Sequence, residues 1–344
     1  MLQFPLLPPV NRYSSLLTQI SGLAQSLAHS SLNKELKLKV FHTQLLRSSL
    51  FSAKIEGNQF TWENLPDLSI NSSEKSHLEI KNTFLALQSI KQLTPPYSFV
   101  TWQTIHKKIM NKLFSPTGKL RTETGAIFDQ FGNLIYLTPE PTEMKKMSKI
   151  WFEQATYQSQ IAWQNQLILV AGLHYYFEKI HPFIDGNGRT GRIILQAQLQ
   201  QTSLFSNLIL PLDQYFEENK ATYYQGLEKN TRLIEPFIEF FLEGISWSLL
   251  KILHDIQSIK KNELPPKELK SDLANIWRRL LPRRQEIYLL IKDHPYLSFD
   301  MIARRFPTIP KRTLSYDVNQ LVKQELVLKH GQTRGVVYSV NSKS

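Results

Sequence analysis

The sequence predicts a mainly α protein with one β-hairpin and a smaller module of helices and strands at its end. Two observations lead to this fold class. Apolar residues recur at helical spacing through most of the chain up to about residue 262. The stretch that begins at Gly125 differs, because β-branched and aromatic residues lie on either side of Phe131-Gly132-Asn133 and predict a hairpin.

The sequence predicts a series of helices between residues 16 and 180. Helical spacing covers residues 16–31, 34–55 and 73–93, and it resumes after a break at residues 94–97, "TPPY". A further helical stretch runs from Pro141 to Ile180. Within it, residues 167–177 are apolar on nearly every side, which predicts a central and buried helix.

The chain is expected to divide into four parts. Residues 1–97 form a helical region, 98–250 a core, 251–275 a linker and 276–344 a separate module. The linker is predicted from residues 260–272, "KKNELPPKELKSD", which are charged and contain two prolines.

Composition excludes several classes of protein. Apolar residues make up 42% and charged residues 20%, which is ordinary for a globular protein. There is no cysteine, so disulfides and thiolate metal sites are excluded. No apolar run approaches the roughly 18 to 20 residues of a membrane span, and the first residues lack the features of a secretory signal. We therefore expect a cytoplasmic protein with no membrane partner.

The C-terminal module is strongly basic. Residues 276–344 hold 13 Lys or Arg and 5 Asp or Glu, so +8 of the net charge of +12 lies there. Three helical patterns, the second with Ser298 as its N-cap, precede two strand-like runs. This order resembles a winged helix-turn-helix, which implies DNA as a partner, although winged helices also bind proteins. The candidate DNA contacts are Lys311, Arg312, Thr313, Ser315 and Arg334.

The stretch "HPFIDGNGRTGR", residues 181–192, concentrates polar chemistry at one place. Its "GNGRTG" satisfies a dinucleotide-binding fingerprint, with Asp213 as an acidic residue further on, but the preceding residues predict a helix and not the required strand. A P-loop fails because "PTGKL" lacks the upstream glycine and the following Ser or Thr. His174 and His181 are seven residues apart, which does not fit zinc.

A helix that ends at Ile180, followed by another that starts near Gly188, gives the motif a clear chemistry. The glycines and the new helix N-terminus form an anion site. Arg189 and Arg192 lie three residues apart and can reach phosphate oxygens. Asp185 suits Mg²⁺ bound to a polyphosphate, and His181 suits a general base. The pattern therefore predicts a nucleotidyl- or phosphoryl-transfer site.

This stretch resembles the signature of the Fic family, H-P-F-x-D/E-G-N-G/K-R-x-x-R, at every specified position. The resemblance implies transfer of AMP from ATP to a protein hydroxyl, with His181 as the general base and Asp185 on Mg²⁺. The implied ATP-binding residues are Asp185, Gly186, Asn187, Gly188, Arg189, Thr190, Gly191, Arg192 and Tyr224. Arg189 could instead form an ion pair that positions its helix, and Tyr224 could simply pack in the core.

Two further segments are similar to parts of that family. Residues 118–144 are similar to its flap hairpin, in which Gly125, Ala126, Ile127 and Phe128 would offer backbone to a target segment. "SAKIEG", residues 52–57, fits the family's inhibitory pattern S/T-x-x-x-E-G/N on a helix at about residues 45–58. The resemblance thus implies an inhibitory role for Ser52, Glu56 and Gly57.

The leading hypothesis is a self-inhibited protein adenylyltransferase that uses ATP and Mg²⁺ and modifies a Ser, Thr or Tyr hydroxyl. Two alternatives stay open. The same residues, with Glu56 orienting a water molecule, would also serve to remove AMP from a modified protein. The second alternative is a DNA-binding regulator whose core senses nucleotide. The oligomeric state also stays open, with a homodimer as one alternative.

Overall fold

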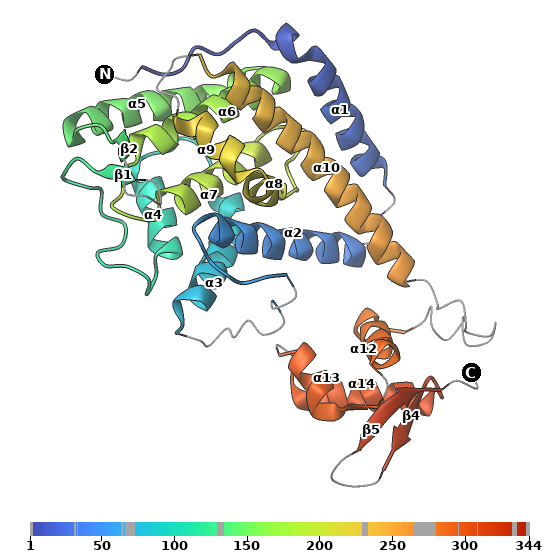
Figure 1. Ribbon diagram of the computed structural model, residues 1–344. Coiled ribbons are helices and arrows are strands. Elements are labelled where there is room, and N and C mark those ends of the chain that lie inside the picture. Colours follow the sequence, from blue (N-terminus) through green and yellow to red (C-terminus); the bar gives the residue numbers. More distant parts are fainter. Residues whose placement is uncertain are drawn as a thin grey trace. The chain divides into compact units, whose positions relative to one another are not determined.

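The computed structural model describes residues 3–30, 32, 34–62, 65, 73–128, 134–228, 233–263, 280–294, 296–307, 309–331 and 336–341. Over these residues the protein is mainly α, as predicted, with two small antiparallel sheets (Figure 1). The chain forms two compact units. The N-terminal unit comprises Met1–Trp62 and Ser69–His254, and the C-terminal unit comprises Asp255–Ser344 together with Glu63–Leu68.

The N-terminal unit contains the regions that the sequence suggested as two parts, residues 1–97 and 98–250. Its elements are η1 (Val10–Tyr13), α1 (Ser14–His29), α2 (Lys34–Ile55), α3 (Lys75–Gln88), η3 (Ile90–Gln92), α4 (Phe99–Ile109), β1 (Ala126–Phe128), β2 (Leu134–Leu137), α5 (Pro141–Tyr157), η4 (Gln158–Gln160), α6 (Trp163–Ile180), α7 (Asn187–Gln200), α8 (Leu212–Glu218), α9 (Lys220–Glu228) and most of α10 (Glu235–Glu263).

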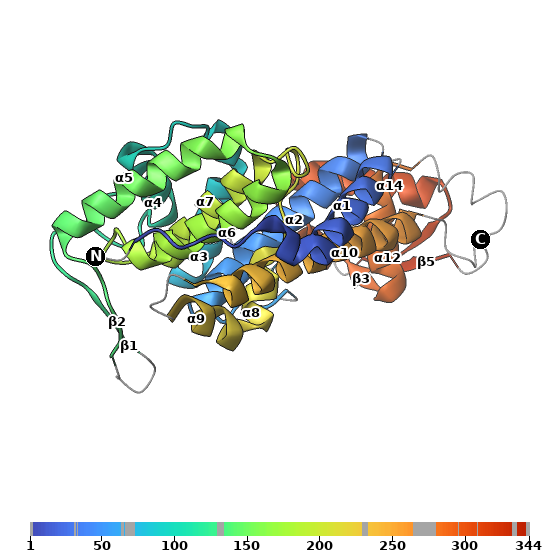
Figure 2. The ribbon, with the colours of Figure 1, turned by 90° about the horizontal axis from the view of Figure 1, so that it is seen from above.

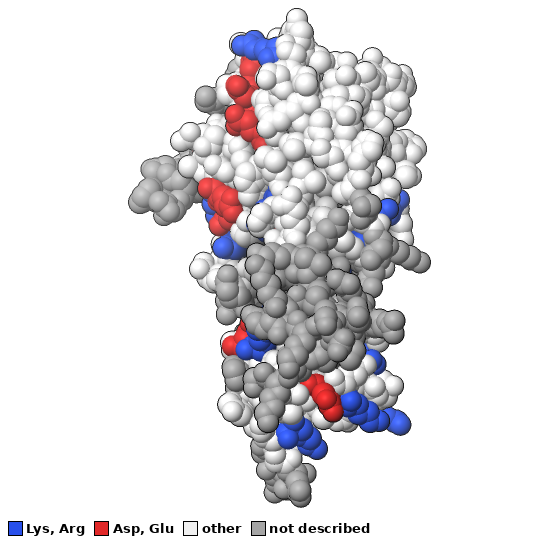
Figure 3. Space-filling model, turned by 90° about the vertical axis from the view of Figure 1, so that its right-hand side faces the viewer, with Lys and Arg blue, Asp and Glu red and all other residues white. Residues whose placement is uncertain are grey.

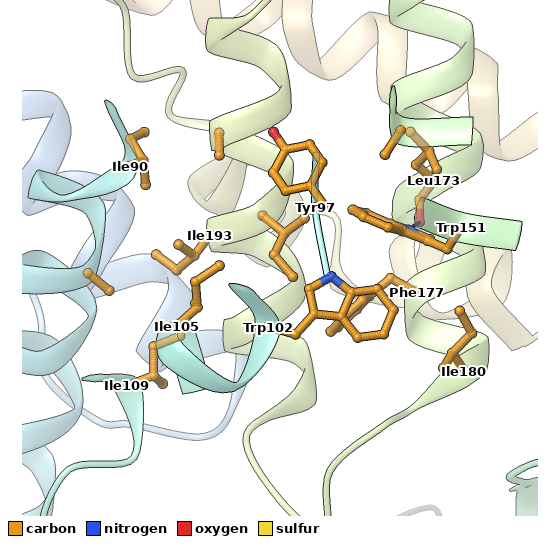
Figure 4. Packing of buried hydrophobic residues seen from close by; sticks show 14 of the residues in the cluster. Ile90, Tyr97, Trp102, Ile105, Ile109, Trp151, Leu173, Phe177, Ile180 and Ile193 are labelled. Atoms are coloured by element: carbon orange, nitrogen blue, oxygen red, sulfur yellow. Dashed lines mark hydrogen bonds between the residues drawn. The ribbon is translucent and has the colours of Figure 1, made fainter. Parts of the chain in front are cut away.

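Helix α6 lies at the centre of this unit and is buried along nearly its whole length, as the apolar pattern predicts. Aromatic side chains from three helices meet beside it (Figure 4). The Trp102 ring of α4 lies 5.0 Å from Trp151 of α5 and 4.8 Å from Phe177 of α6, measured between centroids, in edge-to-face geometry. The Trp151 indole N–H also donates to the carbonyl of Leu173 at 2.8 Å, which fixes α5 against α6.

The connection between α6 and α7 lies against this core. Helix α6 ends at Ile180, where His181 takes the left-handed conformation and Pro182 follows. A proline at this point cannot continue the helix. Helix α7 begins at Asn187, directly after Gly186, which has a positive φ of 76°. The sequence therefore places both helix ends correctly to within a residue.

The hairpin is formed by β1 and β2, which pair antiparallel with Ala126 opposite Leu137 and Ile127 opposite Tyr136. Figure 2 shows it extending beyond the helices of the N-terminal unit. Its predicted turn, Phe131-Gly132-Asn133, lies outside the described residues. At the base of the hairpin, Gly125 N–H donates to the Thr138 hydroxyl at 2.7 Å and Thr138 N–H donates to the Gly125 carbonyl at 2.8 Å.

Helix α10 ends at Glu263, close to residue 262, up to which the sequence predicts helix. The linker was expected from residue 251, so its first part overlaps this helix. The reason is that its apolar spacing continues, because Ile252 and Ile256 are both buried. The rest of the expected linker, residues 264–275, lies outside the described residues.

The C-terminal unit has its own apolar core, which includes Ile287, Leu314 and Leu321. The capping hydroxyl of Ser298 accepts from Met301 N–H, as predicted. The two-residue strand β3 was not predicted, and it pairs with β5 in a sheet of order β3-β5-β4. The elements are α12 (Pro282–Asp293), β3 (Leu297–Ser298), α13 (Phe299–Arg305), α14 (Lys311–Lys323), β4 (Val327–His330) and β5 (Val337–Val340).

The surface of the N-terminal unit is not uniformly charged. Helix α1 contains no Lys, Arg, Asp or Glu, and Figure 3 shows few charged groups on the side of the unit that faces the viewer. Among the described helices, none is both long and apolar enough to cross a membrane.

Candidate active site

The candidate site is built on the loop between α6 and α7, and His181 stands at its first position. Its backbone has φ 47° and ψ 62°, a conformation that costs a non-glycine residue about 1 kcal/mol or more. The ring Nδ1 lies 3.3 Å from the carbonyl oxygen of Glu178. Because a carbonyl can only accept, Nδ1 carries the proton and Nε2 is left free to accept one.

Burial makes this histidine a neutral base. It lowers the pKa of His181 to about 4, although the hydrogen bond to the Glu178 carbonyl opposes the shift. The positive charge of Arg121 lowers this pKa as well. At neutral pH the imidazole is therefore uncharged, as a proton acceptor must be.

Arg121 fixes the backbone around His181. The guanidinium Nε donates to the His181 carbonyl at 2.8 Å and Nη2 donates to the Ile180 carbonyl at 3.3 Å. These carbonyls lie at the C-terminus of α6, where helix geometry leaves carbonyls without intrahelical donors. Nη1 donates to the Glu123 carbonyl at 2.8 Å, and the backbone N–H of Arg121 donates to Pro182 at 3.0 Å.

The middle of the loop is fixed by reciprocal hydrogen bonds. The Asn187 side-chain oxygen accepts from Phe183 N–H, and its amide nitrogen donates to the Phe183 carbonyl, both at 2.8 Å. His106 of α4 stacks on Phe183 with ring centroids 4.0 Å apart. Gly118 N–H donates to His106 Nδ1, so Nε2 carries the proton that is donated to the Asp185 carbonyl at 2.8 Å.

The N-terminus of α7 faces the end of α2. A Cβ atom added to Gly188 would lie 2.5 Å from Glu56 Oε1 and 3.0 Å from Arg192 Nη1. Only glycine therefore lets the Glu56 carboxylate approach the backbone here. The first amides of a helix are unpaired donors that favour anions. Glu56 thus places a carboxylate where this geometry can bind a phosphate.

Arg192 lies among partners from α2 and α8. Its Nη2 donates to Glu56 Oε1 at 2.8 Å and to the Ser52 carbonyl at 3.0 Å, while Nε donates to the Ser52 hydroxyl at 2.9 Å. Asp213 of α8 forms a second ion pair, with its Oδ1 at 3.2 Å from Nε. The inhibitory-pattern residues Ser52 and Glu56 therefore do meet the last arginine of the motif.

Glu56 is held at this place by the way α2 ends. Gly57 has a φ of 94°, its N–H donates to the Lys54 carbonyl, and Asn58 N–H donates to the Ala53 carbonyl. This is a Schellman-type helix stop, which explains a glycine after the glutamate. Burial alone would raise the pKa of Glu56, but the charge and hydrogen bond of Arg192 hold it below its ordinary value. Glu56 is therefore an ionised carboxylate.

Arg189 forms the ion pair that was the alternative interpretation. Its Nη1 lies 3.5 Å from Glu79 Oε1 of α3, and the residue is 4% exposed. Within the part of the chain that the structure describes, its buried Nε and Nη1 nevertheless have no hydrogen-bond acceptor. Unsatisfied buried donors are costly, so these nitrogens fit an anionic ligand such as an ATP phosphate.

The remaining residues of the predicted ATP-binding set make other contacts. Thr190 is fully buried, and its hydroxyl donates to the Gly186 carbonyl at 2.7 Å. Gly191 packs against Phe177 and Glu178 of α6, so a side chain there would collide with both. Tyr224 is partly exposed, and its hydroxyl donates to the Ile55 carbonyl at 3.4 Å. Tyr224 is therefore not simply packed in the core; it contacts the end of α2.

Asp185 is exposed, and its Oδ1 accepts from Gly186 N–H at 2.6 Å. Within the described ranges, no three His, Cys, Asp or Glu side chains gather as a metal site. A Mg²⁺ ion would therefore need oxygens from the nucleotide besides this carboxylate, a donor set that Mg²⁺ accepts. The flap residues Gly125 and Ala126 lie at the start of the hairpin, and the side chains of Ile127 and Phe128 lie outside the described part.

Sequence reasoning missed several residues that contact the motif. Asp213 was weighed only in the rejected dinucleotide fingerprint, and Arg121 and Glu79 were not singled out at all. Each comes to the site from a helix or segment distant in sequence. Arg121 lies just before the flap in the sequence, but its burial is known only from the structure.

The fold and this loop together define a helical protein with a partly buried histidine close to the N-terminus of a helix, where unpaired amides favour an anion. Residues 96–199 match the Fic/DOC family. This part of the chain is therefore similar to the Fic domain. Helix α2 with Ser52, and Glu56 directly after it, lie outside the matched residues.

Among curated proteins, the chain is 29% identical over 109 residues to protein adenylyltransferase Fic of Drosophila erecta. It is 30% identical over 92 residues to protein adenylyltransferase fic-1 of Caenorhabditis elegans. These alignments cover 31% and 26% of this chain, but only 21% and 17% of the two relatives.

Two solved structures share the fold. A Fic family protein from Desulfovibrio desulfuricans G20 has a TM-score of 0.62 at 18% identity and covers 98% of both chains. Fic-1 from C. elegans has a TM-score of 0.54 at 21% identity and covers 70% of this chain and 71% of that chain. The fold of this chain is thus that of Fic proteins.

Proposed function

We propose that this protein is a self-inhibited protein adenylyltransferase, which transfers AMP from ATP to a Ser, Thr or Tyr hydroxyl of a protein, itself included. The observation that carries the proposal is that one short loop holds both a neutral, partly buried imidazole and a helix N-terminus with two arginines suited to phosphate. His181 stands at one end of that loop, and the α7 N-terminus with Arg189 and Arg192 stands at the other. The names of the curated relatives support the same reaction.

The proposed reaction is a single displacement at phosphorus. The hydroxyl oxygen of the target attacks the α-phosphorus of ATP, and His181 Nε2 takes the hydroxyl proton. The bond between the α-phosphorus and the bridging oxygen breaks, and pyrophosphate leaves. The α7 amides, Arg189 and Arg192 would stabilise the phosphate charges, and the start of β1 would bind target backbone. Mg²⁺, held by Asp185 and the nucleotide, would neutralise charge on the leaving group.

Self-inhibition is supported by the position of Glu56. Its carboxylate occupies the guanidinium of Arg192 and lies against Gly188, where phosphate oxygens would bind. ATP would then bind with displaced phosphates, and displacement of the reacting atoms by about 1 Å can cost about 10²-fold in rate.

The test is mass spectrometry of Glu56→Gly and wild type after incubation with ATP and Mg²⁺. The proposal predicts a gain of one AMP on the Glu56→Gly protein and little on wild type. Loss of AMP from a previously modified protein, without any gain from ATP, would favour the reverse reaction. Absence of any AMP gain or loss in both proteins would contradict the transferase.

A second candidate function, DNA binding, is supported by one face of α14. Arg312, Ser315, Tyr316 and Asn319 follow one another at helical spacing, and Arg312, Tyr316 and Asn319 are exposed. Arginine, asparagine and hydroxyl groups on one helix face are able to read base edges in a major groove. Lys311 instead pairs with Asp300 at 3.2 Å, and Arg334 lies outside the described residues.

DNA binding would be tested with the full chain and duplex DNA at several salt concentrations. A nucleic-acid interface predicts affinity that falls steeply with salt and falls further in Asn319→Ala or Arg312→Ala. Equal affinity of both variants and wild type would contradict a role for this face. A winged-helix assignment, a homodimer and a cytoplasmic location remain predictions.

A further inference from the structure

Arg121 is a buried cation whose side-chain hydrogen bonds, among the described residues, all go to main-chain carbonyls. It is 5% exposed, and no ion pair to it is found among the described residues. Two of its bonds reach Ile180 and His181 at the end of α6, and one reaches Glu123 in the segment before β1. A buried arginine without a carboxylate partner is unusual, so its position calls for a role beyond charge pairing.

The two bonded segments carry the two parts that a transfer reaction has to align. One segment sets the backbone of His181, whose left-handed conformation fixes the direction of its side chain. The other leads through Glu123 to Gly125, where the hairpin is closed by the two hydrogen bonds with Thr138. Arg121 thus joins the backbone of the general base to the segment that leads into the hairpin, and the Tyr136 hydroxyl of β2 adds a second link to the end of α6 through the Lys179 carbonyl at 2.9 Å.

We propose that Arg121 is a positioning residue that keeps His181 and the target-docking edge of the hairpin in a fixed mutual geometry. The proposal rests on the transferase function proposed above. The chemistry suits arginine, because its planar guanidinium directs N–H groups along different edges and can bond three carbonyls at once. A lysine ammonium is a single point and cannot reproduce that span.

Among the described residues, the hydrogen bonds of Arg121 do not reach the predicted phosphate site. Its bonds end at Pro182 on the loop, whereas the predicted phosphate contacts begin at Gly186. Loss of the guanidinium should therefore disturb the geometry of attack and leave nucleotide binding nearly unchanged. A purely structural residue would instead lower stability, binding and turnover together.

The kinetic test compares Arg121→Lys, in the Glu56→Gly protein, with a matched control. The control is Lys119→Ala, which removes an exposed cation two residues away on the same segment. We expect Arg121→Lys to lower the maximal labelling rate by about 10²-fold and to change the KM for ATP less than about twofold. Arg121→Gln keeps N–H donors but lacks the forked geometry of the guanidinium, so it should lower the labelling rate as Arg121→Lys does. Lys119→Ala should label at the rate of its Glu56→Gly parent.

A second measurement does not depend on activity. Hydrogen–deuterium exchange of the Arg121→Lys variant, in the wild-type background, should be faster in both residues 122–128 and residues 180–186. Exchange in α7 should be unchanged. Faster exchange in one segment only, or a labelling rate equal to that of the parent, would overturn the proposal. A Glu56→Gly parent that never labels would instead refute the proposed function, and exchange would still decide the role of Arg121.

Discussion

The two ends of the α6–α7 loop are held in different ways. At the His181 end, the partners are main-chain carbonyls and neutral rings, and Arg121 closes the arrangement from a segment within the matched Fic domain. At the Arg192 end, the partners are charged, and the Glu56 carboxylate comes from the residue directly after α2, outside the matched residues. Under the proposed function, the difference teaches that main-chain contacts would fix the base, whereas an ion pair would control the phosphate site.

Removal of the base should have the largest effect on labelling by the Glu56→Gly protein. His181→Ala is expected to lower the rate by about 10²- to 10⁴-fold, because a general base typically contributes that much. ATP binding, measured by calorimetry, should be nearly unchanged, because His181 acts on the hydroxyl and not on the triphosphate. Labelling of His181→Ala at the rate of its parent would show that His181 is not the general base.

Removal of the guanidinium should act differently at the other end of the loop. In the same Glu56→Gly protein, Arg192→Ala is expected to weaken ATP binding and to lower labelling by about 10²-fold. Adenosine, which has no phosphate, should bind both proteins equally. The comparison fails if Arg192→Ala retains full labelling, or if it weakens adenosine binding as strongly as ATP binding.

The pH dependence should report the neutral base. Burial lowers the pKa of His181 to about 4, so the ring stays unprotonated and active well below the ordinary histidine pKa. Replacement of Glu56 removes a negative charge that raises this pKa, so the acid limit should not move up. Labelling by Glu56→Gly at saturating ATP is therefore expected to be flat from about pH 6 to 8. A half-maximal rate near pH 6.5 or above would contradict a buried neutral base.

The smallest effect is expected from the C-terminal unit. A chain that ends at Glu263 keeps all of α10 and loses only residues that belong to the second unit. Because the two units have separate apolar cores, the shortened Glu56→Gly protein should fold and label itself within about twofold of its parent. An insoluble or inactive product would show that folding or labelling of the N-terminal unit depends on the C-terminal unit.

Local pattern predicted the helices and the loop well. The apolar periodicity of α6, the glycines of the motif and the helical spacing over residues 34–55 are all signals within a few residues, and the structure confirms each element. The helical spacing up to about residue 262 agrees with the end of α10 at Glu263, and only the expected start of the linker at residue 251 lies inside this helix, where Ile252 and Ile256 continue the apolar spacing.

The partners of the motif could not be predicted in the same way. Asp213 reaches Arg192 only because α8 packs beside α2, and Glu79 reaches Arg189 only because α3 packs beside α7. Such contacts depend on tertiary packing, and neither residue lies in a local pattern that indicates its partner. Resemblance to the family indicated the motif residues themselves, but it did not indicate these neighbours.

The central claim is that Glu56 keeps the phosphate site inactive through Arg192. The most direct test is self-labelling by wild type, Glu56→Gly and Glu153→Gly, with α-labelled ATP and Mg²⁺. Glu153 is an exposed helix residue, so its replacement controls for loss of a carboxylate and for the helix cost of glycine, about 1 kcal/mol. We predict that Glu56→Gly labels about 10²-fold faster than the other two proteins. Equal labelling by wild type and Glu56→Gly would contradict the account.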